Sequence, residues 1–241
     1  MWALVQAALG RARLLLVGAC SMLLSPVSWG QGSASEFFVS TQQASLAEAA
    51  AEGRVQSLDQ LVKHGADPNA AGRDGMTASY WAVLHRSKAG LQYLLEHGAN
   101  PNVIFSRDGT SATSIAAKLE DPWFLSEILA HKGDVNIRNP LNGRTPLFEA
   151  LYSGRNSNAR LLIAKGADIN VHNYLGSTPL TLAVGNQRFD LAYDMLLAGA
   201  DPQSGGASVS RRCCAIMRIS FDCLSSTRLP PWQCSTEKCV T

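Results

Sequence analysis

The sequence of 241 residues predicts an all-α repeat solenoid, and two recurring strings carry this prediction. The first string, Gly-Ala-Asp-x-Asn with small variations, returns five times along the chain. Its acidic or amide positions are spaced 33, 34, 34 and 33 residues apart: Asp67, Asn100, Asp134, Asp168 and Asp201. The second string, Gly-x-Thr-Pro-Leu, keeps a fixed phase within this period and is clearest from Gly143 and from Gly176. Periods of this size are typical of solenoids built from stacked supersecondary units.

The composition indicates a folded chain whose charge is unevenly distributed. Apolar residues make up 46% of the chain, which excludes wholesale disorder, and charged residues make up 17%. The formal net charge of +2 is the sum of +2 in residues 1–30, −3 in residues 31–203 and +3 in residues 204–241. The predicted repeats are therefore mildly acidic with dispersed arginines, whereas nucleic-acid binding needs a concentrated basic face. We expect no nucleic-acid partner.

Residues 1–30 have the composition of a secretory signal peptide. Arg11 and Arg13 precede an apolar stretch of 11 residues, and the small residues Ser28 and Gly30 follow it. The stretch is shorter than the ~20 apolar residues that span a bilayer. We therefore expect an exported, periplasmic protein, with an N-terminal membrane anchor or a wrongly assigned start codon as alternatives. A loose match to a bacterial lipobox at Cys20 adds a lipid-anchored form as an alternative, and residues 31–44 are interpreted as a polar lead-in.

The repeats are expected to contain helix pairs near residues 77–97, 111–131, 145–165 and 178–198, preceded by a degenerate pair within 45–62. Threonine before proline, as at Thr145 and Thr178, caps a helix N-terminus, and proline fits the first turn. A glycine after the second helix can adopt the left-handed conformation that ends a helix, but Lys132 stands at this position in the third copy. Small residues let the two helices of each pair approach closely: Ala82, Ala116, Ala150 and Ala183.

These strings resemble the ankyrin-repeat family over about residues 45–203. The resemblance implies five units, at about 45–72, 73–103, 104–137, 138–171 and 172–203, with β-hairpin fingers between them. The family's histidine after Thr-Pro-Leu is replaced in this chain by Tyr80, Ser114, Phe148 and Thr181. A histidine network between the repeats is therefore not expected. Three histidines instead share the position that closes the second helix, where we expect them to meet the last carbonyl groups: His64, His97 and His131.

Residues 204–241 differ from the repeats, with five cysteines, a Ser/Arg-rich texture and no helical period. The cysteine spacings match no common four-ligand zinc pattern, and an odd number of thiols cannot all pair internally. We interpret this tail as disordered or as a frame-shifted end, with a disulfide-bonded or metal-binding segment as alternatives. Because a solenoid needs a polar terminal unit, the last helix, with Leu191, Met195 and Leu196, is expected to have an uncovered flank.

The sequence contains no catalytic constellation, so we expect neither an enzyme nor a bound cofactor. Gly205-Gly206 lacks the following lysine and the preceding strand of a phosphate-binding loop. No serine lies in a nucleophile elbow, and the histidines are dispersed. No catalytic residue, metal site or small-molecule substrate is predicted.

The ankyrin resemblance implies a protein-binding surface in which finger tips and first helices line a concave face. Exposed aromatic residues and arginines are the residue types that anchor interfaces. Carried over position by position, the predicted contact residues are Arg73, Asp74, Met76, Tyr80, Trp81, Arg107, Arg138, Arg144, Tyr152, His172 and Tyr174. For Trp81 and Phe148, packing between neighbouring units is an equally open alternative.

The sequence thus predicts a non-catalytic, exported module that binds a periplasmic or envelope protein. Its layout resembles short, signal-bearing ankyrin proteins of Gram-negative bacteria, which implies a protein partner without identifying it. Two further roles stay open, an immunity protein that neutralises an antibacterial toxin and a secreted effector directed at a host. A metal- or redox-active protein centred on the tail cysteines is the rival from another class.

Overall fold

The structure, a computed structural model, describes residues 33–204, and all but the first of these belong to the compact unit that begins at Ala34. The predicted signal peptide, including Cys20, lies outside the described residues, as do the five cysteines of the tail. Export, lipidation and the nature of the tail therefore stay predictions.

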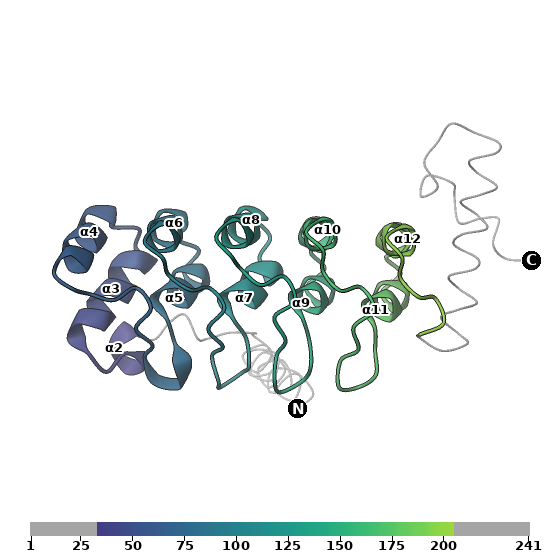
Figure 1. The fold of residues 1–241 in the computed structure, drawn as a ribbon, viewed down its shortest axis with the longest axis horizontal. Helices are drawn as coiled ribbons and strands as arrows, with labels where there is room; N and C mark the ends of the chain where they lie inside the picture. The colour runs from purple at the N-terminus through teal and green to yellow at the C-terminus, as the bar shows by residue number, and fades with distance from the viewer. Residues whose placement is uncertain (1–32, 205–241) are drawn as a thin grey trace, which may run out of the picture. The chain divides into compact units, whose positions relative to one another are not determined.

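Five helix pairs are stacked in chain order in the described unit (Figure 1). The inner row, next to the fingers, consists of α3 (Thr41–Ala51), α5 (Ala78–Leu84), α7 (Ala112–Lys118), α9 (Pro146–Tyr152) and α11 (Pro179–Gly185). The outer row consists of α4 (Val55–Lys63), α6 (Lys88–Glu96), α8 (Trp123–Ala130), α10 (Asn156–Ala164) and α12 (Phe189–Leu197). Each inner helix packs on its outer partner and on the next inner helix. The predicted all-α repeat solenoid is confirmed.

The core lies between the two rows of helices. The four alanines predicted to permit close approach are all fully buried: Ala82, Ala116, Ala150 and Ala183. Leu191 and Met195 of α12 are also fully buried, because α12 packs on α11 and α10, so the prediction of an uncovered flank is wrong for these two side chains. The exposed apolar residues of this helix are Phe189 and Leu197 instead.

The outer helices end as the glycine positions predict. Gly65 has a positive φ of 88°, and the N–H of Ala66 bonds back to the Leu61 carbonyl at 3.0 Å, which closes the helix end. Lys132 occupies the equivalent position with φ 64°, a left-handed conformation that is costly for a residue with a Cβ. The fold therefore imposes the glycine conformation on a lysine at the end of α8.

Three of the five inner helices begin with a side-chain cap, among them α11 with the predicted cap at Thr178, whereas α3 and α9 begin without one. Thr77, Ser111 and Thr178 each accept a hydrogen bond from a backbone N–H three residues later. Thr145 makes no such bond at the start of α9, and its buried hydroxyl oxygen has no hydrogen-bond partner. The prediction of a threonine cap is wrong at this helix, although Pro146 does occupy its first turn.

The recurring histidines lie at the ends of outer helices, as predicted. In each, Nδ1 contacts the carbonyl oxygen four residues earlier, at 2.6, 2.7 and 3.1 Å for His64, His97 and His131. Each of these carbonyl groups also accepts the backbone N–H of the same histidine, so the ring adds a second contact at the helix end.

The asparagine of the first string links each unit to the next. The Asn102 carboxamide donates to the Lys132 carbonyl at 2.9 Å and accepts from the Asp134 N–H at 2.7 Å. Asn69, Asn136 and Asn170 make the same pair of contacts one period apart. The period of 33 or 34 residues therefore places the same two hydrogen bonds from one asparagine at each junction between units. We call this pair of hydrogen bonds the staple.

The fingers are hairpin loops, and in each of them a backbone hydrogen bond joins the two ends of the loop. The bonds join Gly72 to Met76, Phe105 to Thr110, Asn139 to Arg144 and Asn173 to Ser177. Each finger takes the number of the unit that it begins, so these pairs mark the ends of the second, third, fourth and fifth fingers. The 3-10 helix η2 (Arg73–Gly75) lies in the second finger. Within residues 33–204 the β-structure is limited to an isolated bridge between Phe105 and Thr110, so the implied β-hairpins are loops here.

The lead-in differs from the polar segment that we expected. A single-turn helix, α2 (Ala34–Phe37), precedes α3, which itself begins four residues earlier than the predicted repeat boundary. Phe37 and Phe38 are 7% and 4% exposed and belong to the buried core. This part of the chain is therefore packed against the repeats.

Candidate functional site

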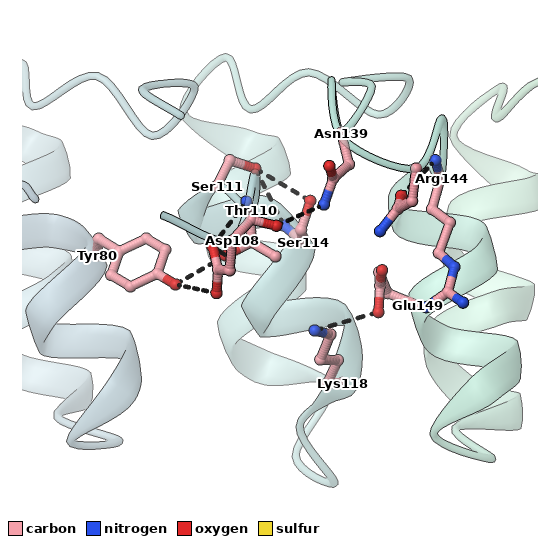
Figure 2. Close-up of polar contacts among 10 residues, drawn as sticks. Tyr80, Asp108, Thr110, Ser111, Ser114, Lys118, Asn139, Arg144 and Glu149 are labelled. Carbon is pink, nitrogen blue, oxygen red and sulfur yellow. Dashed lines mark hydrogen bonds and ion pairs between the residues drawn. The ribbon is translucent and has the colours of Figure 1, made fainter. Parts of the chain in front are cut away.

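The candidate site is the finger face, which we define as the surface formed by the four fingers and the inner row of helices. Adjacent fingers are joined along this face by hydrogen bonds from Ser106 N–H to the Asp74 carbonyl and from Tyr174 N–H to the Asn142 carbonyl, at 2.7 and 3.0 Å. The Asn139 carboxamide donates to the Asp108 carbonyl at 2.9 Å between the third and fourth fingers (Figure 2). The fingers are thus fixed relative to one another before any partner binds.

Three of the predicted contact residues are buried beneath this face. Met76, Tyr80 and Trp81 are 1%, 3% and 2% exposed, so their prediction as surface contacts is wrong. Met76 precedes the cap of α5 and joins the core, and Trp81 lies under the rings of Phe37 and Phe38. Packing is the outcome for Phe148 as well, which is fully buried.

The Tyr80 hydroxyl joins a polar network between α5 and the third finger (Figure 2). It lies 2.7 Å from the Thr110 hydroxyl, which in turn donates to the Asp108 carboxylate at 2.7 Å. Burial raises the pKa of Tyr80 well above its usual range, so the phenol stays neutral. This tyrosine therefore links the second unit to the third through Thr110 and Asp108.

Asp74 and Arg107 pair with each other across two fingers. Both Nε and Nη2 of Arg107 donate to one Asp74 carboxylate oxygen, at 3.1 and 2.7 Å. The guanidinium also lies over the rings of Phe37 and Phe105, at 5.7 and 5.8 Å from their centroids. Both residues are exposed, as predicted, but they are engaged within the chain, whereas Arg73 is exposed on the second finger beside them.

A buried carboxylate lies on the inner row of helices and was not among the predicted residues. Glu149 of α9 is 5% exposed, and its Oε2 is 3.1 Å from the Lys118 Nζ of α7 (Figure 2). The sequence does not predict this pairing, because Glu149 simply stands between Phe148 and the small residue Ala150 in the second string. The ion pair ties α7 to α9.

The fourth and fifth fingers and the end of α9 form a surface that we call the C-terminal patch: Arg138, Leu141, Arg144, Tyr152, Tyr174 and Leu175. The Arg138 Nη2 donates to the His172 carbonyl at 2.7 Å, and its guanidinium stacks over the Tyr174 ring at 5.3 Å. A Cβ at Gly143 would lie 2.6 Å from the Tyr174 ring, so the glycine permits the ring to pack there. The patch is therefore pre-organised.

Large apolar side chains of the C-terminal patch face solvent. Leu141 and Tyr174 are each 60% exposed, and Leu175 is 82% exposed. Arg144 stacks over the half-exposed Tyr152 ring at 4.1 Å. Residues 138–144 and 172–177 contain two arginines, a histidine and no carboxylate. Leu175 was not among the predicted contacts, because a lone leucine in a turn-rich stretch gives no signal of its exposure.

The described residues show no arrangement that favours chemistry over binding. Within 33–204, no group of three or more His, Cys, Asp or Glu side chains could hold a metal ion. Over the same residues, every helix is too short or too polar to cross a membrane. The arrangement fits recognition by an apolar and cationic surface.

Comparison with known proteins agrees with the architecture. A family model described as "Ankyrin repeats (3 copies)" matches residues 12–105 and 113–205. Protein PhlB of Serratia liquefaciens is 35% identical over 176 residues, which cover 73% of this chain and 77% of PhlB. The B-cell lymphoma 3 protein homolog of Mus musculus is 31% identical over 144 residues, and the mitochondrial disaggregase of Bos taurus is 33% identical over 150 residues. The matches cover 58% and 60% of this chain but only 32% and 21% of those two proteins. The chain belongs to the ankyrin-repeat family.

Proposed function

We propose that this ankyrin-repeat chain, a protein-interaction module, is exported and binds a periplasmic or envelope protein through the C-terminal patch of its finger face. The exposure of Leu141, Tyr174 and Leu175 is the observation that carries the proposal. Aromatic and aliphatic side chains next to arginines are the residues that anchor protein interfaces. The units that bear them are stapled together, so a partner meets a rigid surface.

The export part of the proposal rests on the leader-like composition of residues 1–30 and is supported by the similarity to a bacterial protein of comparable length. We propose cleavage after residue 30 and a soluble periplasmic product. Fractionation of cells and mass determination of the N-terminus test this directly. A product that keeps residues 1–30, or one that carries lipid on Cys20, would contradict soluble export.

Binding is tested by affinity capture from periplasmic extract with two matched leucine variants. Leu175→Glu changes the patch, whereas Leu197→Glu changes another largely exposed leucine, at the end of α12 and away from the fingers. We expect the wild type and the Leu197 variant to enrich the same protein and the Leu175 variant to lose it. Equal enrichment by both variants would place the contact elsewhere, and enrichment of nothing by folded wild type would contradict the proposed function.

The nature of the captured protein separates the remaining roles. A toxin whose activity the chain suppresses would identify an immunity protein, and recovery of the chain in the medium with a host-derived partner would identify an effector. The net charge of −3 in residues 31–203, with its arginines dispersed along the sequence, favours a protein over a nucleic acid as the partner.

A further inference from the structure

The N-terminal half of the finger face already holds a segment of the chain. Phe37 and Phe38 come from the lead-in, outside the repeat period, yet they lie against residues more than 30 positions away. The Phe37 ring is 5.4 Å from the Trp81 ring of α5 and 6.5 Å from the Phe105 ring of the third finger. The Phe38 ring meets Trp81 edge-on at 6.4 Å.

The receiving surface, which we define as Gly72, Trp81, Phe105 and Arg107, belongs to the same fingers and inner helices as the rest of the finger face. It combines two aromatic rings with a guanidinium that lies over Phe37. Tilted and edge-on aromatic contacts and a cation–π contact are the interactions that anchor a bound peptide side chain. The lead-in thus occupies this surface as a ligand would and does not add a further helix pair.

Gly72 shows that the receiving surface is shaped for the segment. Its φ of −80° is accessible to any residue, so its backbone conformation does not require glycine. A Cβ at this position would instead collide with the Phe37 carbonyl oxygen and lie 2.9 Å from Cδ1 of Phe38. The glycine therefore makes room for the aromatic pair.

We infer that the receiving surface is a recognition site for two adjacent aromatic side chains, filled in cis by Phe37 and Phe38, and that a partner protein carrying such a pair competes for it. This inference rests on the proposed function and names the chemistry of a partner segment for the N-terminal half of the face. Only Val39 and Ser40 separate Phe38 from α3, so the tether gives the cis segment an effective concentration of about millimolar or more. The apparent affinity of a competing partner is therefore reduced, because it is proportional to the fraction of molecules in which the site is empty.

The test uses a fluorescent peptide with the sequence of residues 33–40 and a control peptide in which both phenylalanines are alanine. Binding is measured by fluorescence anisotropy with the full chain, as wild type and as Phe37→Ala/Phe38→Ala. We expect the double variant to bind the peptide at least tenfold more tightly than the wild type and to ignore the control peptide. Adding Trp81→Ala should abolish this binding.

A second variant keeps both rings and guards against loss of folding in the first. Gly72→Ala should release the segment, so chymotrypsin should cut after Phe37 or Phe38 at least tenfold faster than in the wild type while the repeats stay helical by circular dichroism. Unchanged cleavage in Gly72→Ala, equal affinity of the two peptides, or no binding to a folded double variant would overturn the inference. These readouts need no natural partner, so their failure is distinguishable from a failed capture experiment.

Discussion

The staple at Asn102 gives the sharpest test of how the units are held together. Asn102→Ala removes a carboxamide that both donates to the Lys132 carbonyl and accepts from the Asp134 N–H, at 2.9 and 2.7 Å. Each hydrogen bond contributes about 0.5–1.5 kcal/mol net, so the loss of two predicts about 1–3 kcal/mol of destabilisation. The staple is partly exposed, and water can replace part of it, which favours the lower half of this range.

The last unit supplies the matched control. Gln203 stands where the other units have asparagine, and its backbone N–H donates to the Asp201 carboxylate at 2.8 Å, the same local contact that the asparagines make. No further helix pair follows within the described residues. Gln203→Ala is therefore expected to change the free energy of unfolding by less than about 0.5 kcal/mol.

Urea unfolding followed by circular dichroism measures both variants. For an array of this size, each kcal/mol corresponds to roughly 2–4 °C in Tm, so Asn102→Ala should also melt measurably earlier. A broadened transition would show that the junction between the second and third units had lost cooperativity. If Asn102→Ala and Gln203→Ala unfold together with the wild type, the recurring asparagine is not a staple.

Three further predictions follow from the geometry of the helices. Lys132→Gly should stabilise the chain by up to about 1 kcal/mol in urea unfolding because it relieves a left-handed residue, whereas Lys165→Gly, at φ −90°, should destabilise it. Tyr80→Phe should cost about 1 kcal/mol by removing the contact with Thr110, and an unchanged midpoint would show that this contact is not stabilising. The Lys88 ammonium, 2.6 Å away, and the Trp123 N–H hold the pKa of Asp121 below its ordinary value. The stability that this ion pair contributes is therefore present above the unfolded-state pKa of Asp121 and is lost as the pH falls through its folded-state pKa. We expect the Tm of Asp121→Asn to converge on the Tm of the wild type in acid. A difference in Tm that stays constant with pH would contradict the pairing.

The periodic features of the fold were predictable because the sequence repeats them. The helix pairs, the buried alanines and the histidines at helix ends each recur at one position, so every copy supports the others. Thr145 shows the limit of this reasoning, since its string is among the best copies and its hydroxyl still makes no cap. A side chain's hydrogen bond depends on a rotamer that the string does not specify.

The features outside the period were not predictable in the same way. Trp81 occupies a position that a partner could contact, and it is buried because Phe37 and Phe38 cover it from outside the repeats. The residues next to Trp81 in the sequence give no indication that these two phenylalanines cover it. The same holds for the ion pair between Glu149 and Lys118, which joins two units. The charge pattern of neither repeat indicates that these two residues pair.

Hydrogen exchange of the chain with and without its captured partner tests the central claim most directly. The account predicts that binding slows exchange in residues 138–144 and 172–177, where the C-terminal patch lies, and leaves the outer helices α4, α6, α8, α10 and α12 unchanged. Protection confined to the outer helices, with the fourth and fifth fingers exchanging as they do in the free chain, would contradict it.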